Sequence, residues 1–577
     1  MIEPKSFEKQ FVKEGIISEE QAKKIREEAN EKGLPISQIL IQKGITTEET
    51  VYSLLANYCG LNFVIVSNTE IPQELIKSVP ARFATHYEFV PVKEKNNTLV
   101  VAVSDPLNAG LLDDIRLVLK KRIEPVVTTP KEIQRAIKEY YGVGADTVER
   151  ILVSEEHTGE EVNLESTAVS ANLGDETIDA SIIKFVNELI VEAIRAEATD
   201  IHIEPFEDFL RVRFRIDGIL HTVPTPPSIR NFHSSIVSRI KIMANLNIAE
   251  KRLPQDGKIM ANLGDGKYDL RVSILPTPHG ETINIRILSR TSMFLSLDKL
   301  GFSSDDIKLF NSFITKPYGI ILVTGPTGSG KTTTLYAALD KLNRTDRKII
   351  TIEDPIEYQM QGITQMQVHP RIGFDFATGL RSMLRHDPDI MLVGEIRDYE
   401  TAEMAIRSSL TGHLVLSTLH TNDAPGAVTR LIDMGVEPFL ISSTMIASMA
   451  QRLVRKICNQ CKTKDNPDPY VLEAEFGYKK ENNDIIFYKG SGCEHCRSTG
   501  YRGRMAICEI MPFSPMIKEL TVQRATSVAI KKQALSEGMK TLRASGWQRI
   551  MEGLTTVEEV LRVTADAEIM EETHADI

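Results

Sequence analysis

The sequence predicts a multidomain α/β protein whose C-terminal half contains a parallel sheet with a phosphate-binding loop. Two observations predict this fold class. Short apolar strands alternate with helical stretches after residue 304, which is the pattern of a parallel sheet covered on both faces. The glycine-rich stretch GPTGSGKT stands between one of those strands and a helix. At 577 residues, 42% of them hydrophobic, the chain has the length of roughly three to five domains.

Charge and hydropathy narrow the classes of partner. The net charge of −11 offers no basic surplus for a polyanion, so nucleic acid is not an expected partner. No apolar run approaches the roughly 20 residues of a membrane-spanning helix, and the N-terminal stretch is too polar for a secretory signal. We therefore expect a cytoplasmic protein that reaches a membrane only through partners. In that reducing compartment the six cysteines are not expected to form disulfides.

Residues 1–60 contain an internal repeat, in which FVKEGIISEEQ aligns with LIQKGITTEET. The aligned glycines, Gly15 and Gly44, each predict the end of one helix just before the start of another. Ser18 with Gln21 predicts a capping box at the second helix. We expect two packed helical hairpins whose apolar residues form a core rather than a binding surface.

The next two segments differ in composition. Residues 61–145 predict a small α/β domain, with strands at LNFVIV and TLVVAVSD and helices at NAGLLDDIRLVLKK and TPKEIQRAIKEYYG. Residues 146–176 hold nine acidic residues against one arginine and lack sustained periodicity. That composition predicts a flexible linker.

Residues 177–304 predict an α+β domain with a mostly antiparallel sheet. In FLRVRFRIDGIL apolar residues alternate with arginines, and Asp217-Gly218 predicts a tight hairpin turn. The same alternation in YDLRVSIL and INIRIL places Arg271 and Arg286 on polar strand faces, without an obvious carboxylate partner in the sequence. The helix that opens this domain has one apolar face, formed by Ile178, Ile182, Phe185, Val186, Leu189 and Ala193.

The glycine-rich stretch lies within a predicted core domain at 305–456 and satisfies the pattern G-x-x-x-x-G-K-[ST]. Its glycines let successive backbone N–H groups point at phosphate oxygens, and the helix that follows presents its positive N-terminal end. Lys331 would bridge the β- and γ-phosphates, and Thr332 would hold Mg²⁺. The predicted nucleotide contacts are Gly325, Pro326, Thr327, Gly328, Ser329, Gly330, Lys331, Thr332 and Thr333.

Acidic residues stand at the ends of two neighbouring strands. Glu395 ends DIMLVGE, and in a protein that hydrolyses the bound nucleotide it would polarise the water that attacks the γ-phosphate. Gly394 occupies the place where hydrolases with this phosphate loop usually have a Mg²⁺-binding aspartate. Glu353 and Asp354 end the strand KIITIED. Since parallel strands end at one edge of a sheet, we expect these carboxylates to converge on the ligand.

Two histidines flank the strand in GHLVLSTLHTND. His413 precedes this strand and His420 follows it. His420 lies at the carboxyl end of the strand, where it could sense the γ-phosphate.

Four cysteines form two CxxC pairs, Cys458 with Cys461 and Cys493 with Cys496, separated by 31 residues. Two thiolates from each pair would give a tetrahedral sulfur site suited to Zn²⁺. The sequence offers no separate candidate for an open coordination position, as a catalytic metal would need. We therefore expect a structural zinc module at 457–500. Residues 501–577 predict a C-terminal helical subdomain.

Taken together, several stretches resemble the ATPase superfamily of type II secretion and type IV pili. These are GPTGSGKTTTLYAAL, ITIEDPIEY, LRHDPDIMLVGEIRD and TGHLVLSTLHTNDA, with ATDIHIEP, RFRIDGIL, AEKRLPQDGKI and HGETINIRIL before them. They occur in the order of that family. The resemblance is strong over residues 177–577 and looser before them.

The resemblance implies a homohexamer with ATP bound between a PAS-like α+β domain and a RecA-like core. It implies Glu353 and Asp354 in an aspartate box, Glu395 as the catalytic glutamate, and His413 and His420 in a histidine box. The remaining implied site residues are Arg271 and Arg286, which match arginines of the earlier domain that reach the γ-phosphate. Fixed guanidinium groups there would stabilise the transferring phosphoryl group.

The bipartite N-terminal region and the four cysteines resemble pilus assembly ATPases more than retraction motors, which lack both. The implied task is to drive an inner-membrane platform protein in pilus extension, with other assembly proteins docking on the N-terminal domains. The alternative within the family is a type II secretion ATPase. Related N-terminal bundles bind cyclic di-GMP through repeats that start Arg-Leu-Gly. Because Ser6-Phe7-Glu8 and Pro35-Ile36-Ser37 stand at those starts, we do not predict that ligand.

Two other function classes stay open at this point. A nucleic-acid translocase is disfavoured by the net charge and by the absence of basic residues interleaved with aromatic ones. A module that only senses nucleotide is disfavoured by the presence of a candidate catalytic glutamate together with candidate arginine fingers.

Overall fold

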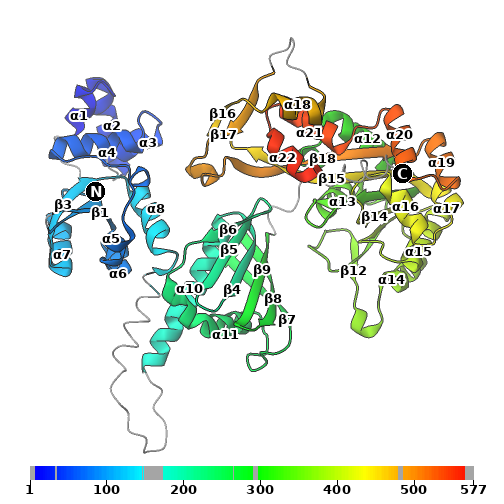
Figure 1. The fold of residues 1–577 in the computed structure, drawn as a ribbon, viewed down its shortest axis with the longest axis horizontal. Coiled ribbons are helices and arrows are strands. Elements are labelled where there is room, and N and C mark those ends of the chain that lie inside the picture. The colour runs from blue at the N-terminus through cyan, green and yellow to red at the C-terminus, as the bar shows by residue number, and fades with distance from the viewer. Residues whose placement is uncertain are drawn as a thin grey trace, which may run out of the picture. The chain divides into compact units, whose positions relative to one another are not determined.

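The chain is described here by a computed structural model (Figure 1). It divides into two compact units, Met1–Leu288 and Ser289–Ile577. The described residues are 7–32, 36–95, 97–145, 147, 173–263, 266–289, 296–478 and 485–565. Most of the predicted linker, and the repeat starts at Ser6 and Pro35, lie outside them. At the end of the predicted linker, helix α10 already begins at Leu173 rather than at 177.

Four helices at the N-terminal end confirm the internal repeat. Gly15 and Gly44 both adopt the left-handed conformation, with φ of 70° and 68°, and each ends a helix. The capping box is present, since the Ser18 N–H donates to Gln21 Oε1 at 2.9 Å and the Gln21 N–H donates to Ser18 Oγ at 3.3 Å. Apolar side chains of all the helices share one buried core. The helices are α1 (Glu8–Lys13), α2 (Glu19–Lys32), α3 (Ile36–Gln42) and α4 (Glu48–Cys59).

A three-stranded sheet follows, with helices packed around it. The predicted strand at TLVVAV and the two predicted helices are confirmed. The predicted strand at LNFVIV is wrong, because only Phe63 bridges Val127 and the chain then turns into a 3-10 helix at Val66–Asn68. A short apolar run fits any buried extended segment. The elements are α5 (Gln73–Lys77), α6 (Ala81–His86), β1 (Phe89–Lys95), β2 (Thr98–Val103), α7 (Ala109–Leu119), β3 (Arg122–Val127) and α8 (Pro130–Tyr141).

The rest of the first unit is a six-stranded sheet in the order β6-β5-β4-β9-β8-β7, covered on its apolar face by α10 and α11 (Figure 1). The predicted hairpin turn is confirmed, since Asp217 and Gly218 have φ of 48° and 86° and Ile216 pairs with Ile219. The predicted apolar face of α10 is buried from Ile182 onward. The elements are α10 (Leu173–Arg195), β4 (Ala198–Pro205), β5 (Leu210–Ile216), β6 (Ile219–Val223), α11 (His233–Met243), β7 (Gln255–Leu263), β8 (Gly266–Thr277) and β9 (Gly280–Ser289).

The second unit is built on a seven-stranded sheet in the order β12-β11-β13-β14-β10-β15-β18. All pairs are parallel except β15 with β18, so the predicted parallel sheet is confirmed. Successive residues of β10 enter different cores, Ile320 on one face and Ile321 on the other, because both faces are covered. The strands are β10 (Gly319–Thr324), β11 (Ile349–Glu353), β12 (Thr364–Gln367), β13 (Ile390–Val393), β14 (Leu414–Leu419), β15 (Met445–Ile457) and β18 (Tyr501–Pro512).

Helices cover both faces of this sheet (Figure 1). Residues 501–512, expected to be helical, instead form β18 and close one edge of the sheet against β15. A two-stranded sheet, β16 (Lys462–Asp465) with β17 (Phe487–Gly490), lies between β15 and β18 in the chain. The helices are α12 (Ser304–Ile314), α13 (Lys331–Leu342), α14 (Phe376–Met383), α15 (Tyr399–Leu410), α16 (Gly426–Asp433), α17 (Pro438–Thr444), α18 (Pro469–Phe476), α19 (Pro515–Val522), α20 (Ser527–Ser536), α21 (Leu542–Met551) and α22 (Val557–Thr564). Among the described helices, none has both the length and the apolar character that crossing a bilayer requires.

Candidate nucleotide site and tetracysteine cluster

The glycine-rich loop follows β10 and leads directly into α13, as the sequence predicts. Gly325, Gly328 and Gly330 have φ of 144°, 80° and 88°, values that residues other than glycine rarely adopt. Helix α13 begins at Lys331, so its N-terminal N–H groups lie at the loop. This arrangement offers a phosphate several backbone donors and the positive end of a helix.

The Lys331 ammonium lies within this loop. Its Nζ donates to the carbonyl oxygens of Gly325 at 2.7 Å and Pro326 at 3.1 Å. Burial lowers the pKa of Lys331 to about 8; the carboxylate of Glu395 raises it and the guanidinium of Arg452 lowers it further. The loop therefore holds a cation at the position where phosphate charge would be bound.

Glu395 and His420 meet at the carboxyl edge of the sheet. Glu395 follows β13, and its Oε2 lies 3.4 Å from His420 Nε2, while its Oε1 is paired with Arg397. Burial holds the pKa of His420 below its ordinary value, the charge of Lys331 lowers it further, and Glu395 opposes the shift. A carboxylate, an imidazole and an ammonium thus share one edge of the sheet.

The acidic pair at the end of β11 is divided between core and solvent. Glu353 is buried, and its Oε1 accepts hydrogen bonds from Thr351 Oγ1 at 2.6 Å and Gln365 Nε2 at 3.2 Å. The Tyr336 hydroxyl of α13 donates to Glu353 Oε2. Burial also raises the pKa of Glu353. Asp354 is exposed, so only this second carboxylate faces solvent.

Gly394 has a structural reason to lack a side chain. A Cβ built there would lie 3.3 Å from both the Glu353 Cα and the Ile352 carbonyl oxygen. Strands β11 and β13 therefore pack too closely at this point to accommodate an aspartate without movement.

The structure does not bring His413 to this cluster. His413 precedes β14, where its Nδ1 lies 2.8 Å from the carbonyl oxygen of Ser408 and 3.1 Å from Thr411 Oγ1. His420 follows the other end of the same strand. At about 3.3 Å per residue, a strand of this length separates the two histidines by roughly 20 Å.

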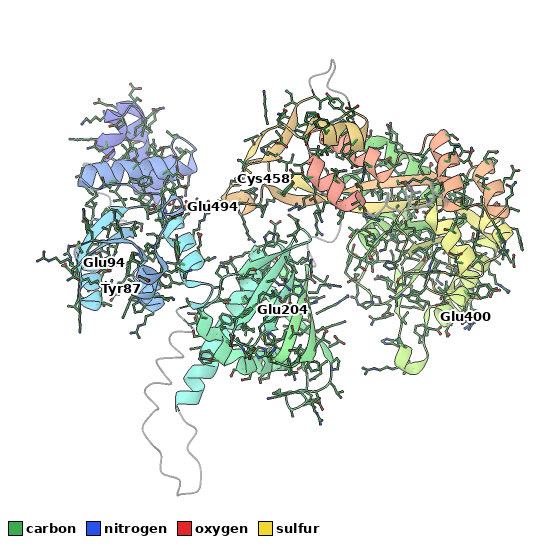
Figure 2. All side chains as sticks on the ribbon, viewed as in Figure 1. Tyr87, Glu94, Glu204, Glu400, Cys458 and Glu494 are labelled. Carbon is green, nitrogen blue, oxygen red and sulfur yellow. The ribbon has the colours of Figure 1, made fainter. Side chains whose placement is uncertain are left out.

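Arg271 and Arg286 lie on the polar face of the six-stranded sheet in the first unit. The sequence shows no obvious carboxylate partner for Arg286, and the structure supplies one, since its Nε lies 3.2 Å from Asp200 Oδ1, across the pairing of β4 with β9. Arg271 is half-buried on β8, opposite Lys258 of β7. Further carboxylates are paired on this face, including Glu204, which lies near the middle of the sheet in Figure 2 and accepts from two arginines of β5. Arg286 and the arginines of β5 therefore lie in a network of alternating charge.

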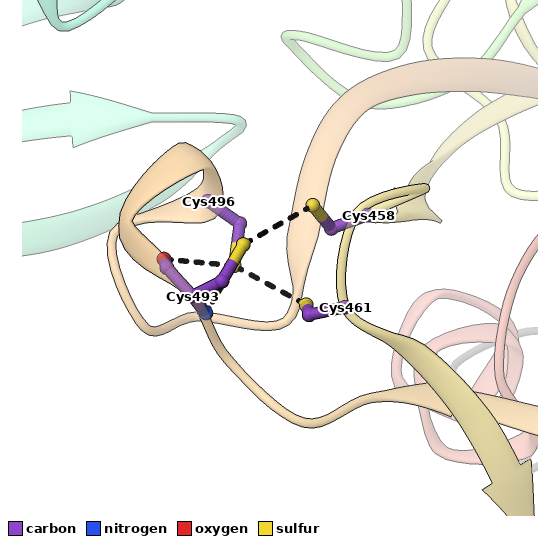
Figure 3. Close-up of side chains that lie close together, drawn as sticks. All are labelled: Cys458, Cys461, Cys493 and Cys496. Atoms are coloured by element: carbon purple, nitrogen blue, oxygen red, sulfur yellow. Dashed lines mark hydrogen bonds between the residues drawn. The ribbon is translucent and has the colours of Figure 1, made fainter. Parts of the chain in front are cut away.

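The four predicted cysteines come together. Their Sγ atoms all lie within 4.8 Å of one another, and they approach from two loops, one after β15 and one before β18 (Figure 3). The Sγ–Sγ distances are 3.8 Å for Cys458 with Cys493 and 3.7 Å for Cys461 with Cys496. Four sulfurs about 2.3 Å from a tetrahedral Zn²⁺ would be about 3.8 Å apart. The N–H groups of Cys493 and Gly500 also point at Cys496 Sγ, each at 3.2 Å, which favours a thiolate there.

Sequence reasoning missed three buried polar side chains near the nucleotide loops. Gln451 and Arg452 belong to β15, and Glu509 belongs to β18. The available signal was a Gln-Arg pair inside the apolar run MIASMAQRLV, since buried polar groups require partners.

Residues 175–562 match the family model described as "Type II/IV secretion system protein". The chain belongs to this family. The order of the sequence motifs, the phosphate loop and the parallel sheet agree with that membership. The chain is an ATPase of the secretion-system class. Residues 59–147 match a second model, the MshEN domain.

Curated relatives of this secretion-system family cover nearly the whole chain. The "Type IV pilus assembly ATPase PilB" of Myxococcus xanthus (strain DK1622) is 43% identical over 558 residues, which are 96% of this chain and 98% of the relative. The "Type II secretion system protein E" of Xanthomonas campestris pv. campestris is 41% identical over 541 residues, 93% of this chain and 94% of the relative. The PilB of Pseudomonas aeruginosa is 36% identical and covers 98% of this chain and 99% of the relative. The family resemblance predicted from the sequence is confirmed.

Proposed function

We propose that this chain is a hexameric motor that hydrolyses ATP to extend type IV pili through an inner-membrane platform protein. The observation that carries the proposal is the match to a pilus assembly ATPase over 96% of this chain and 98% of that relative. The glycine-rich loop with Lys331 at its centre supports the ATPase part independently.

ATP binds with its phosphates on residues 325–333. The N–H groups of the loop and of the first turn of α13 contact the phosphates, and Lys331 exchanges its carbonyl partners for phosphate oxygens. Thr332 and Asp354 are the residues that would hold Mg²⁺, since Glu353 is buried and already hydrogen-bonded by three side chains. When bound, Mg²⁺ supplies positive charge at the β- and γ-phosphates.

Glu395 orients and polarises the attacking water. Its carboxylate is held by Arg397 on one side and by His420 on the other, so it is fixed before substrate arrives. His420 would contact the γ-phosphate and so couple its presence to the position of the Glu395 carboxylate. Glu353 acts by positioning: it joins β11 to α13 through Tyr336 and so fixes the base of the phosphate loop.

The earlier sheet domain, which we infer to be PAS-like, supplies Arg271 and Arg286 to the terminal phosphate of a nucleotide bound on a RecA-like core. Arg286 would leave Asp200 to do so; its own side chain is half exposed, and the buried Asp200 would keep Thr199 and Arg215 as partners. Repeated closure of this domain around six subunits would move the platform protein at the membrane.

The tetracysteine cluster holds a structural Zn²⁺, with Cys458, Cys461, Cys493 and Cys496 as its ligands. The sulfur spacing and the N–H groups directed at Cys496 support this assignment. The ion would fix the loop before β16 to the loop before β18.

A type II secretion ATPase is the second candidate, since the Xanthomonas relative is 41% identical over 93% of this chain. Either motor would lie at the cytoplasmic face of the inner membrane, held there by its partners. The N-terminal domains are the proposed docking sites for those partners.

A strain whose chromosomal gene encodes the Lys331→Ala variant tests the proposal. It also distinguishes a pilus assembly ATPase from a type II secretion ATPase. We expect loss of surface pili with normal export of secreted enzymes, and the purified variant should keep the thermal stability of the wild type without binding ATP. Normal piliation with failed export would assign the chain to type II secretion. Normal piliation and normal export would refute both assignments.

A further inference from the structure

Two adjacent residues of β15, Gln451 and Arg452, contact the two loops of the nucleotide site. Both side chains are buried, with 1% and 7% exposure. Long polar side chains are seldom buried unless they make hydrogen bonds that replace those lost to water. The groups they bind therefore indicate why they are there.

Gln451 of β15 binds the phosphate loop and the helix that follows it. Its Nε2 donates to the carbonyl oxygen of Ser329 at 2.9 Å, and its Oε1 accepts from the Thr334 hydroxyl of α13 at 2.8 Å. The contact is close, since a Cβ built at Gly330 would lie 2.7 Å from Gln451 Nε2. One amide thus joins the loop to the helix that follows it.

Arg452 holds the loop after β14, residues 420–426, which we call the His420 loop. Its Nη2 donates to the carbonyl oxygen of Asn422 at 3.0 Å, and its Nη1 donates to the carbonyl oxygen of Gln451 at 3.1 Å. Nη1 also lies 3.1 Å from the Cβ position built at Gly325. The planar guanidinium therefore lies between the His420 loop and the start of the phosphate loop.

The strands on either side of β15 hold the next residues of the His420 loop. Thr324 of β10 donates through Oγ1 to the carbonyl oxygen of Asp423 at 3.4 Å. Glu509 of β18 accepts from the N–H of Ala424 at 2.8 Å. Three consecutive loop residues are thus fixed by three neighbouring strands, at the point where His420 meets Glu395.

We propose that Arg452 is a positioning residue for ATP hydrolysis, which fixes the His420 loop relative to the phosphate loop that Gln451 holds on the same strand. The proposal rests on the ATPase function given above. Because adjacent residues of one strand hold both loops, the backbone of β15 sets the distance between Lys331 and His420. A misplacement of about 1 Å can cost about 100-fold in rate.

The two side chains should then have different effects when removed. Loss of the Gln451 contacts loosens the loop that binds the diphosphate, which ADP and ATP share. Loss of the Arg452 contacts displaces the loop that meets Glu395, which acts on turnover. Arg452→Met and Gln451→Met remove the polar atoms and keep much of the volume.

A double-mutant cycle on the full-length chain tests this proposal, with kcat for ATP and Kd for ADP as readouts. We expect Arg452→Met to lower kcat about tenfold while Kd for ADP changes less than about twofold. In a His420→Ala background, the same substitution should lower kcat less than about twofold further, because Arg452 acts through that loop. Gln451→Met should instead raise Kd for ADP about tenfold.

Ser448→Ala is the matched control, since the Ser448 hydroxyl is buried in the same strand and has no hydrogen-bond partner in the described part of the chain. It should leave kcat and Kd unchanged. Equal losses from Arg452→Met in the wild-type and His420→Ala backgrounds would overturn the proposal. If the methionine variant does not fold, Arg452→Lys is compared in both backgrounds by the same criterion. A wild-type chain without ATPase activity would refute the proposed function instead.

Discussion

At the residue scale, the nucleotide site depends on which side chains are directed at solvent and which at the core. Glu353 and Asp354 are neighbours, yet Glu353 is buried and hydrogen-bonded to Tyr336, Thr351 and Gln365, while Asp354 is exposed. Their roles must differ accordingly, one structural and one open to a ligand. The Glu395 side chain keeps 12% exposure and is held in orientation by Arg397 and His420.

Glu395→Gln should lower kcat at least about 100-fold, because an amide cannot act as a base toward the attacking water. Binding of ATP should persist, since the loop and Lys331 are untouched. Steady-state hydrolysis and nucleotide titration measure the two effects. Glu403→Gln, which replaces a carboxylate paired with Arg407 on α15, should keep normal turnover. A Glu395→Gln protein with the wild-type rate would show that another group activates the water.

Glu509 predicts a pH dependence of stability. Burial raises its pKa from 4.5 to about 7, although the N–H of Ala424 favours the charged form. A carboxyl group with a raised pKa stabilises the fold below its unfolded pKa, and this contribution is lost as pH rises through the folded pKa. The loss amounts to at most about 3 kcal/mol.

The thermal midpoint of the wild type should therefore fall by a few degrees relative to Glu509→Gln between pH 5 and pH 8. Scanning calorimetry of both proteins across that range measures the difference. The exposed substitution Glu519→Gln should track the wild type. Parallel curves for wild type and Glu509→Gln would mean that Glu509 ionises in the folded chain without a penalty.

At the scale of elements, the outermost strand at one side of the seven-stranded sheet, β18, comes from far along the chain. β18 pairs with β15, and the tetracysteine loops connect β15 to β16 and β17 to β18. A metal ion at these cysteines would fix the register of this edge. Because β15 also carries Gln451 and Arg452, the edge supports the nucleotide loops.

Cys461→Ser should remove bound metal and destabilise this edge. The wild type should contain about one Zn²⁺ per chain, and the variant should contain far less, with a lower thermal midpoint. Elemental analysis and thermal denaturation measure both. Cys59→Ser, outside the cluster, should retain the ion. A wild-type protein purified without zinc and with full stability would contradict the assignment.

At the scale of the whole molecule, the proposed motor needs both compact units. The phosphate loop belongs to the second unit, and the two candidate arginines belong to the first. Coupling of hydrolysis to motion would follow if closure of one domain on the other brings these arginines to the phosphate.

Arg271→Gln and Arg286→Gln should each lower kcat by about 10³-fold while leaving Kd for ADP nearly unchanged, since they would contact only the terminal phosphate. Turnover and ADP binding in the assembled protein are the measurements. Arg211→Gln is the matched control, because Arg211 lies on the same polar face and is paired with Glu204. Normal turnover in both arginine variants would separate the first unit from the chemistry.

The sequence by itself determined the features that lie in contiguous residues. The phosphate loop, the strands that flank it, the CxxC pairs, the repeat with Gly15 and Gly44, and the Asp217-Gly218 hairpin depend on local conformation and spacing, which neighbouring residues dictate. The placement of Glu395 at a strand end follows from the same local pattern. The order of these stretches was enough to indicate the family.

Only the tertiary structure decided which distant side chains meet. It buried Glu353 against Tyr336, paired Arg286 with Asp200, brought His420 to Glu395, and placed 501–512, expected to be helical, in strand β18. It also brought Gln451 and Arg452 under two loops more than 25 residues away in the chain. These contacts arise from strand order and packing between segments far apart in sequence, and a local pattern holds no information about either.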